Sequence, residues 1–258
     1  MQIAANLYRI GSDMVNSYIV VDGDDATIVD AGLPGYWKLL GPELAAMGKT
    51  LDHVRALVLT HGDSDHLGFA ARLCREKGIT AYLHPADAER ARLMTKKPRS
   101  SWGETRIGPV VQFLWYAARH GGLRIPRLEQ VQPMNDGDVL DIPGRPRIIH
   151  MPGHTQGSVS VLVPGCDALF VGDALSTRNV LNGSTGPAIA PFTLDRAQAM
   201  GSLDRLKTID ATWVLPGHGP AWDGGVTQAV QSAHNQPGAA HSTGVPPVGS
   251  RRPFSAHN

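Results

Sequence analysis

Histidine and aspartate side chains crowd into one short segment of this chain. Residues 60–68 read Thr-His-Gly-Asp-Ser-Asp-His-Leu-Gly and place two imidazoles and two carboxylates at His61, Asp63, Asp65 and His66. Groups of this kind, packed together, repel one another or remain without partners unless a cation collects them. A divalent metal ion is therefore the simplest explanation for the cluster.

Three later segments share one local form, an apolar stretch that ends beside glycine and a single metal-binding side chain. The three side chains are His154, Asp173 and His218. Glycine next to each donor lets the backbone approach the site closely. With the first cluster they make seven candidate ligands, which is too many for one tetrahedral ion and suits two.

Regular elements are expected on both sides of the first cluster. Residues 54–59 are rich in Val and Leu and predict a buried strand, whereas 69–77 carry apolar residues at helical spacing before Gly78. The cluster would then occupy the loop between a strand and a helix, where a metal site is held in fixed geometry. Further helices are predicted over 37–47 and 194–207.

The order of these motifs resembles that of the metallo-β-lactamase-fold hydrolases. It runs His-x-x-x-Asp-His, Pro-Gly-His-Thr, Gly-Asp and Pro-Gly-His-Gly, and Asp30-Ala31-Gly32 matches an earlier strand-loop of that family. The similarity extends from about residue 8 to about residue 222. It implies an α+β fold, a four-layer αβ/βα sandwich with the metal site at one edge of two sheets.

The resemblance also implies two groups of ligands, one for each of two divalent ions. The first ligand group would be His61, Asp63 and His154. The second ligand group would be Asp65, His66 and His218, with Asp173 bridging the two ions. Asp65 would be the catalytic residue that orients the nucleophile, and Asp30 would orient a ligand imidazole.

Position 63 departs from the family pattern, which is usually His-x-His-x-Asp-His. A carboxylate is shorter and harder than an imidazole and adds one negative charge. Asp63 can still be a ligand, which favours iron or manganese or weakens a first zinc. It can instead miss the ion, which leaves a site with only the second metal or a partly filled site. In the third alternative the site is catalytically weakened. We expect a retained, occupied site, with Zn²⁺ as the leading ion and Fe or Mn as alternatives.

The expected function is that of a metal-dependent hydrolase in which a metal-activated hydroxide attacks a small acyl substrate. Resemblance to soluble lactonase and glyoxalase II-type members points to a lactone, thioester or ester, with a β-lactam as a further option. The chain has no Gly-x-Ser-x-Gly elbow, P-loop or Gly-x-Gly-x-x-Gly fingerprint.

Two alternatives belong to other functional classes. Flavodiiron-type redox enzymes carry a carboxylate, usually Glu, at the position matching Asp63, but they normally continue into a flavin-binding domain for which this chain has no room. A metal-binding protein without hydrolytic activity is the second alternative. Zinc and oxygen-independent turnover would favour the hydrolase over both.

The composition of the chain limits the kinds of binding partner and the cellular location that we expect. A formal net charge of +1 over 258 residues gives no long-range attraction for nucleic acid. No stretch is long enough to span a bilayer, and nothing at the N-terminus marks secretion, so we expect a cytoplasmic protein. Cys74 and Cys166 are expected to be thiols rather than a disulfide or ligands. The oligomeric state is left open.

One domain over residues 1–225 is predicted, with a helical insertion at 85–123 lying over the site and a disordered tail at 226–258. In the insertion, 110–116 would either line an apolar pocket or pack the insertion onto the sandwich. Five of its cationic residues would either gather an anionic substrate or, as we favour, form a solvated helix face. They are Arg90, Arg92, Lys96, Lys97 and Arg99.

Overall fold

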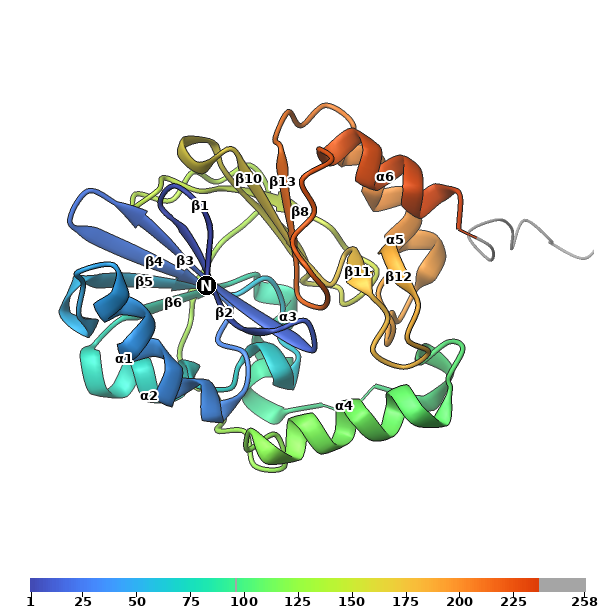
Figure 1. Ribbon diagram of the computed structural model, residues 1–258, viewed down its shortest axis with the longest axis horizontal. Coiled ribbons are helices and arrows are strands. Elements are labelled where there is room, and N and C mark those ends of the chain that lie inside the picture. The colour runs from blue at the N-terminus through green and yellow to red at the C-terminus, as the bar shows by residue number, and fades with distance from the viewer. Residues whose placement is uncertain (96, 237–258) are drawn as a thin grey trace, which may run out of the picture.

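The computed structural model describes residues 1–95 and 97–236. Two β-sheets face each other, and helices cover both outer sides (Figure 1). The larger sheet has the order β1-β2-β3-β4-β5-β6-β7 and the smaller one β13-β10-β9-β8. A separate two-stranded sheet pairs β11 with β12. The predicted α+β sandwich is therefore confirmed.

The strands of the larger sheet follow chain order, antiparallel at first and parallel from β4 onward. They are β1 (Gln2–Ala4), β2 (Leu7–Ser12), β3 (Val15–Asp22), β4 (Asp25–Val29), β5 (Val54–Val58), β6 (Thr80–Leu83) and β7 (Gln132–Pro133).

The smaller sheet combines antiparallel β8-β9-β10 pairing with a parallel β10-β13 pair. Its strands are β8 (Arg147–His150), β9 (Val159–Val163), β10 (Ala168–Gly172) and β13 (Trp213–Pro216), and the hairpin consists of β11 (Ser176–Arg178) and β12 (Thr185–Ala188). Because β4 and β5 are parallel, their carboxyl ends lie at the same edge of the larger sheet. The carboxyl ends of the parallel strands β10 and β13 likewise lie at one edge of the smaller sheet.

Three apolar clusters define the four layers. Side chains from both sheets, including Tyr18 and Phe170, pack between the sheets. Leu40 of α1 (Trp37–Ala46) and Leu73 of α2 (Ala70–Lys77) pack on the outer face of the larger sheet. The helices α5 (Arg196–Leu203) and α6 (Val226–His234) cover the smaller sheet. Burial of these faces is the main driving force for the fold.

The predicted disordered tail at 226–258 is wrong for its first part, because residues 226–234 form α6. Val226, Ala229, Val230 and Ala233 are buried at helical spacing against the smaller sheet. The polar residues between them concealed this pattern in the sequence. Residues 237–258 lie outside the described residues, so the remainder of that prediction is untested.

The insertion at 85–123 is helical, with α3 (Pro85–Leu93) and α4 (Ile107–Arg119). In Figure 1, α4 runs along the lower side of the molecule. Cys74 and Cys166 are free thiols, as expected. Among the described residues, no helix is long and apolar enough to cross a bilayer.

Candidate metal centre

The predicted ligands come together at one edge of the sandwich, although they lie on separate parts of the chain. The loop 60–68 follows β5, Asp173 follows β10 and His218 follows β13, while His154 lies in the loop between β8 and β9. Their donor atoms form three sets, and within each set all donor atoms lie within 4.8 Å of one another. These sets are His61–Asp63–His154, Asp65–His66–His218 and His61–His66–Asp173.

His61 and His66 are each fixed through Nδ1. The Nδ1 atom of His66 lies 2.9 Å from Oδ2 of Asp30, and Nδ1 of His61 lies 3.0 Å from Oγ1 of Thr60. That hydroxyl donates to Asp30 in turn, at 2.8 Å. Both rings can thus donate through Nδ1, so that Nε2 is left to face the centre of the site.

His154 and His218 are held in the same way by other partners. Nδ1 of His154 lies 3.2 Å from Oγ1 of Thr193, and Nδ1 of His218 lies 2.5 Å from the carbonyl oxygen of Met14. Because each Nδ1 has an acceptor, each Nε2 can offer a lone pair. This is the tautomer that a metal-binding imidazole requires when it binds through Nε2.

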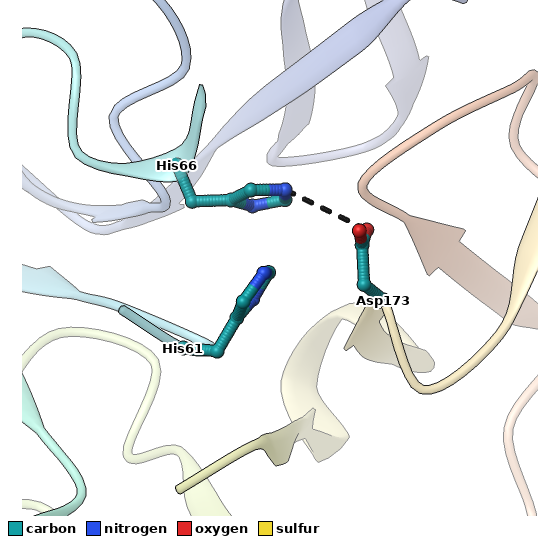
Figure 2. Close-up of side chains that lie close together, drawn as sticks. All are labelled: His61, His66 and Asp173. Carbon is teal, nitrogen blue, oxygen red and sulfur yellow. Dashed lines mark ion pairs between the residues drawn. The ribbon is translucent and has the colours of Figure 1, made fainter. Parts of the chain in front are cut away.

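Several donor atoms at the centre are buried without a hydrogen-bond partner among the residues that the structure describes. They are Nε2 of His61, Nε2 of His66 and Oδ1 of Asp173. Figure 2 shows the two rings and the carboxylate converging on one point. Unpaired buried polar atoms are costly, so their convergence indicates that a bound cation is part of the native site.

The distances between donors match the size of a metal polyhedron. Nε2 of His66 lies 3.5 Å from Oδ1 of Asp173, and Nε2 of His218 lies 3.2 Å from Oδ2 of Asp173 and 3.5 Å from Oδ2 of Asp65. Ligands at about 2.0–2.1 Å from a tetrahedral ion are separated by roughly 3.3 Å. The second ligand group therefore fits an ion with little rearrangement.

Glycine at position 217 allows this close packing. A Cβ atom at Gly217 would collide with Oδ1 of Asp173 and with the ring of His66. The Pro-Gly-His-Gly segment thus brings His218 to the site, and at Gly217 only backbone atoms face Asp173 and His66. Any larger residue at position 217 would force these ligands apart.

The buried charges of the second ligand group shift one another's pKa values. Burial alone would lower the pKa of His66, but the negative charges of Asp30 and Asp173 raise it to about 10. Burial also opposes protonation of His218, yet Asp173 raises its pKa. Although burial would raise the pKa of Asp173, the facing imidazoles hold it well below its usual range.

Asp63 of the first ligand group has different neighbours. Its Oδ2 lies 2.5 Å from Nζ of Lys97 and 3.1 Å from Nε2 of His154, and its Oδ1 accepts a hydrogen bond from Arg90 at 3.0 Å. Burial would raise the pKa of Asp63, but the Lys97 charge and the imidazoles hold it well below its usual range. Burial, reinforced by Lys97, lowers the pKa of His154 to about 3.

The expected solvated cationic face is therefore wrong for two of its members. The side chains of Lys97 and Arg90 are 6% and 14% exposed, and both point to Asp63. Arg92 and Arg99 are exposed, as expected. Lys96 lies outside the described residues.

Asp87 is a site residue that the sequence did not reveal. This buried carboxylate of α3 accepts hydrogen bonds from Gly62 N at 2.7 Å, Gly157 N at 3.0 Å and Thr155 Oγ1 at 2.7 Å. It joins the loop that carries His61 to the loop that carries His154. The only local signal was an acidic residue in the first turn of a helix, which is common at the surface.

Two buried polar residues of β3 hold the loop around His218. The Asn16 amide donates to the carbonyl oxygens of Pro216 and Gly219, at 2.9 and 2.7 Å, and the Tyr18 hydroxyl donates to that of Pro216 at 2.7 Å. In the sequence they appear only as polar interruptions of an apolar strand, so their partners could not be identified.

The helix α4 of the insertion also contacts the site. Phe113 is buried, and its ring centre lies 6.0 Å from that of His218 in an edge-on arrangement. Trp115 is 62% exposed and faces away. The hydroxyl of Tyr116 bonds to that of Tyr36 at 2.7 Å. Residues 110–116 thus divide between packing and solvent, and Phe113 is the residue of this stretch whose ring packs beside a candidate ligand.

Comparison with known proteins identifies the class to which this site belongs. The model of the metallo-β-lactamase superfamily matches residues 10–218, so the chain belongs to that superfamily. The resemblance inferred from the motifs is thereby confirmed.

Particular relatives show how this similarity extends along the chain. The uncharacterized protein ML0493 of Mycobacterium leprae is 31% identical over 220 residues, covering 82% of this chain and 89% of its own. The probable metallo-hydrolase YybB of Bacillus subtilis is 24% identical over 205 residues, covering 80% of each chain. The crystal structure of TTHA1623 in a di-iron-bound form is 27% identical with a TM-score of 0.59, covering 88% of this chain and 97% of that one.

Proposed function

We propose that this protein is a metal-dependent hydrolase that cleaves small acyl substrates such as lactones, thioesters or esters. The observation that carries the proposal is the set of imidazoles anchored at Nδ1, whose Nε2 atoms converge with Asp173 in a buried centre. Membership of the metallo-β-lactamase superfamily and similarity to a probable metallo-hydrolase support it.

Asp65, His66, His218 and Asp173 would hold the ion. When bound there, a divalent ion lowers the pKa of a water molecule toward neutrality and polarises an acyl oxygen. Asp65 would orient that water and accept its proton. Its side chain is 20% exposed, which leaves it more open than the ligands around it and able to face an entering substrate.

Zinc is the proposed ion, with iron as the alternative to test. The relative TTHA1623 is described in a di-iron-bound form, and a carboxylate at position 63 is a harder ligand than the usual imidazole. The sequence predicts two ions; elemental analysis of protein purified without added metal measures both identity and number.

The test combines the measured metal content with a panel of lactones, thioesters and esters assayed with and without oxygen. Turnover without oxygen, removed by a chelator and restored by zinc or iron, is the expected result. His218→Ala should abolish it, whereas His53→Ala, at a histidine outside the ligand groups, should not. Activity that survives His218→Ala, or that needs oxygen and an electron donor, would overturn the proposal.

A further inference from the structure

We propose that the ammonium group of Lys97 takes the place of the first of the two predicted ions, so that this chain binds one ion, through the second ligand group. This inference rests on the metal centre of the proposed function but not on its acyl substrate. The juxtaposition that carries it is Lys97 between Asp63 and His154, two members of the first ligand group.

Lys97 already uses the atoms that a first ion would need. Its Nζ lies 2.7 Å from Nε2 of His154 and 2.5 Å from Oδ2 of Asp63. An ammonium group can only donate, so it engages the lone pairs of both atoms. Since Nδ1 of His154 faces the Thr193 hydroxyl, Nε2 is the acceptor in this arrangement.

The second oxygen of Asp63 is also paired with a cation. Nη1 of Arg90 donates to Oδ1 at 3.0 Å and to the carbonyl oxygen of Thr95 at 2.9 Å. Both carboxylate oxygens therefore face fixed positive charge. An imidazole at position 63 would offer no negative charge to pair with Lys97 and Arg90, so the unusual residue at 63 and the two cations form one unit.

The position of Lys97 is that of a structural cation rather than a mobile surface group. Its side chain is 6% exposed, and a buried ammonium group is stable only beside acceptors that compensate its lost hydration. A divalent ion bound to Asp63 and His154 would lie next to this charge and be repelled by it. Binding there would require Lys97 to leave both of its partners.

The second ligand group has no such competitor. Within the described part of the chain, no Lys or Arg side chain forms an ion pair with Asp65 or Asp173. Nε2 of His66 and Oδ1 of Asp173 lack partners among these residues, as does Nε2 of His61. Because His61 lies within ligand range of His66 and Asp173, it can serve the single ion.

The arrangement places a permanent positive charge beside one exchangeable ion. Asp63 and His154 take two of the three ammonium hydrogens of Lys97, which leaves one for an oxygen of a bound substrate. Lys97 would thereby polarise or bind that oxygen, a task that a second ion performs in a binuclear site.

The test is the number of zinc ions bound by the full chain after chelator treatment and dialysis against excess zinc. We expect about one ion per chain for the native protein and for Lys38→Met, and about two for Lys97→Met, because that variant frees Asp63 and His154. Lys38 is the matched control, since it is exposed on α1 and loses the same charge.

Two ions in the native chain, or one in a folded Lys97→Met variant, would overturn the inference. If Lys97→Met does not fold, electron paramagnetic resonance of the native chain loaded with excess Co²⁺ decides instead. Uncoupled high-spin Co²⁺ supports one ion, whereas a coupled pair contradicts it. One bound ion without turnover on the acyl panel would refute only the proposed substrate, and no bound metal would refute both proposals.

Discussion

The two halves of the metal centre are held by different parts of the molecule. The second ligand group is fixed by the ends and backbone of the sheets: Asp30 follows β4 and supports His66, and the carbonyl of Met14 supports His218. The helical insertion contacts the first ligand group in two ways. Asp87 binds the loop that carries His61, and Lys97 contacts the donor atom of His154.

This difference shows how a family site can change without a change of fold. The second half depends on strands whose positions are set by the packing of two sheets. The first half depends in addition on Asp87, Arg90 and Lys97 of the insertion, which contact its loops and donor atoms. If Lys97 replaces the first ion, one carboxylate at position 63 and one lysine in the insertion have turned a ligand group into an ion pair.

The largest expected effect comes from Asp173, the carboxylate shared by both ligand groups, compared with Asp63 of the first ligand group alone. Asp173→Ala removes the carboxylate that faces His66, His154 and His218, and we expect zinc affinity to fall by more than about 100-fold, since even supporting residues of metal sites contribute about 10–100-fold. Asp63→Ala should retain one ion. Competition with a chromophoric chelator measures both affinities, and an equal loss in the two variants would contradict the division.

A smaller effect is expected from the residues behind the ligands. Asp30→Asn weakens the acceptor for Nδ1 of His66, so zinc affinity should fall by about 10–100-fold. Thr193→Val removes the corresponding acceptor behind His154 and should leave zinc affinity close to native. The same chelator assay tests the pair. A larger loss in Thr193→Val would place the bound ion in the first ligand group instead.

The sequence predicted the fold and the position of each candidate ligand because these depend on short, ordered motifs at strand ends. The roles of Asp87 and Lys97 were missed for a physical reason. Their partners at Gly157 and His154 are distant in the chain, and a helix with alternating charges is more often solvated. Only the folded structure shows that Asp87 on α3 and Lys97 after that helix point inward.

Asp87→Ala should lower the stability of the fold more than it lowers the metal affinity of the second ligand group. It leaves two backbone N–H groups and the Thr155 hydroxyl without their buried acceptor, and we expect a loss of about 3 kcal/mol in the free energy of unfolding. Urea unfolding of the metal-free chain measures it. Asp141→Ala, at an exposed position, is the control and should be close to native. Near-native stability of Asp87→Ala would show that water replaces the carboxylate.

The number of protons released on metal binding gives a further, smaller difference between the two ligand groups. The pKa of His66 is raised to about 10, so at pH 8 its ring is protonated in the metal-free chain, whereas the pKa of His154 is lowered to about 3 and its ring is already neutral. An ion that binds Nε2 of His66 should therefore release at least about one proton at pH 8, and its apparent affinity should rise with pH until about pH 10.

Calorimetric titration with zinc at pH 8, in buffers of different ionisation enthalpy, counts these protons. Asp30→Asn removes a negative charge that raises the pKa of His66, so fewer protons should be released from that variant. Binding without proton release in the native chain would mean that the ion enters beside neutral His154 rather than His66. That result would reverse the assignment of the two ligand groups.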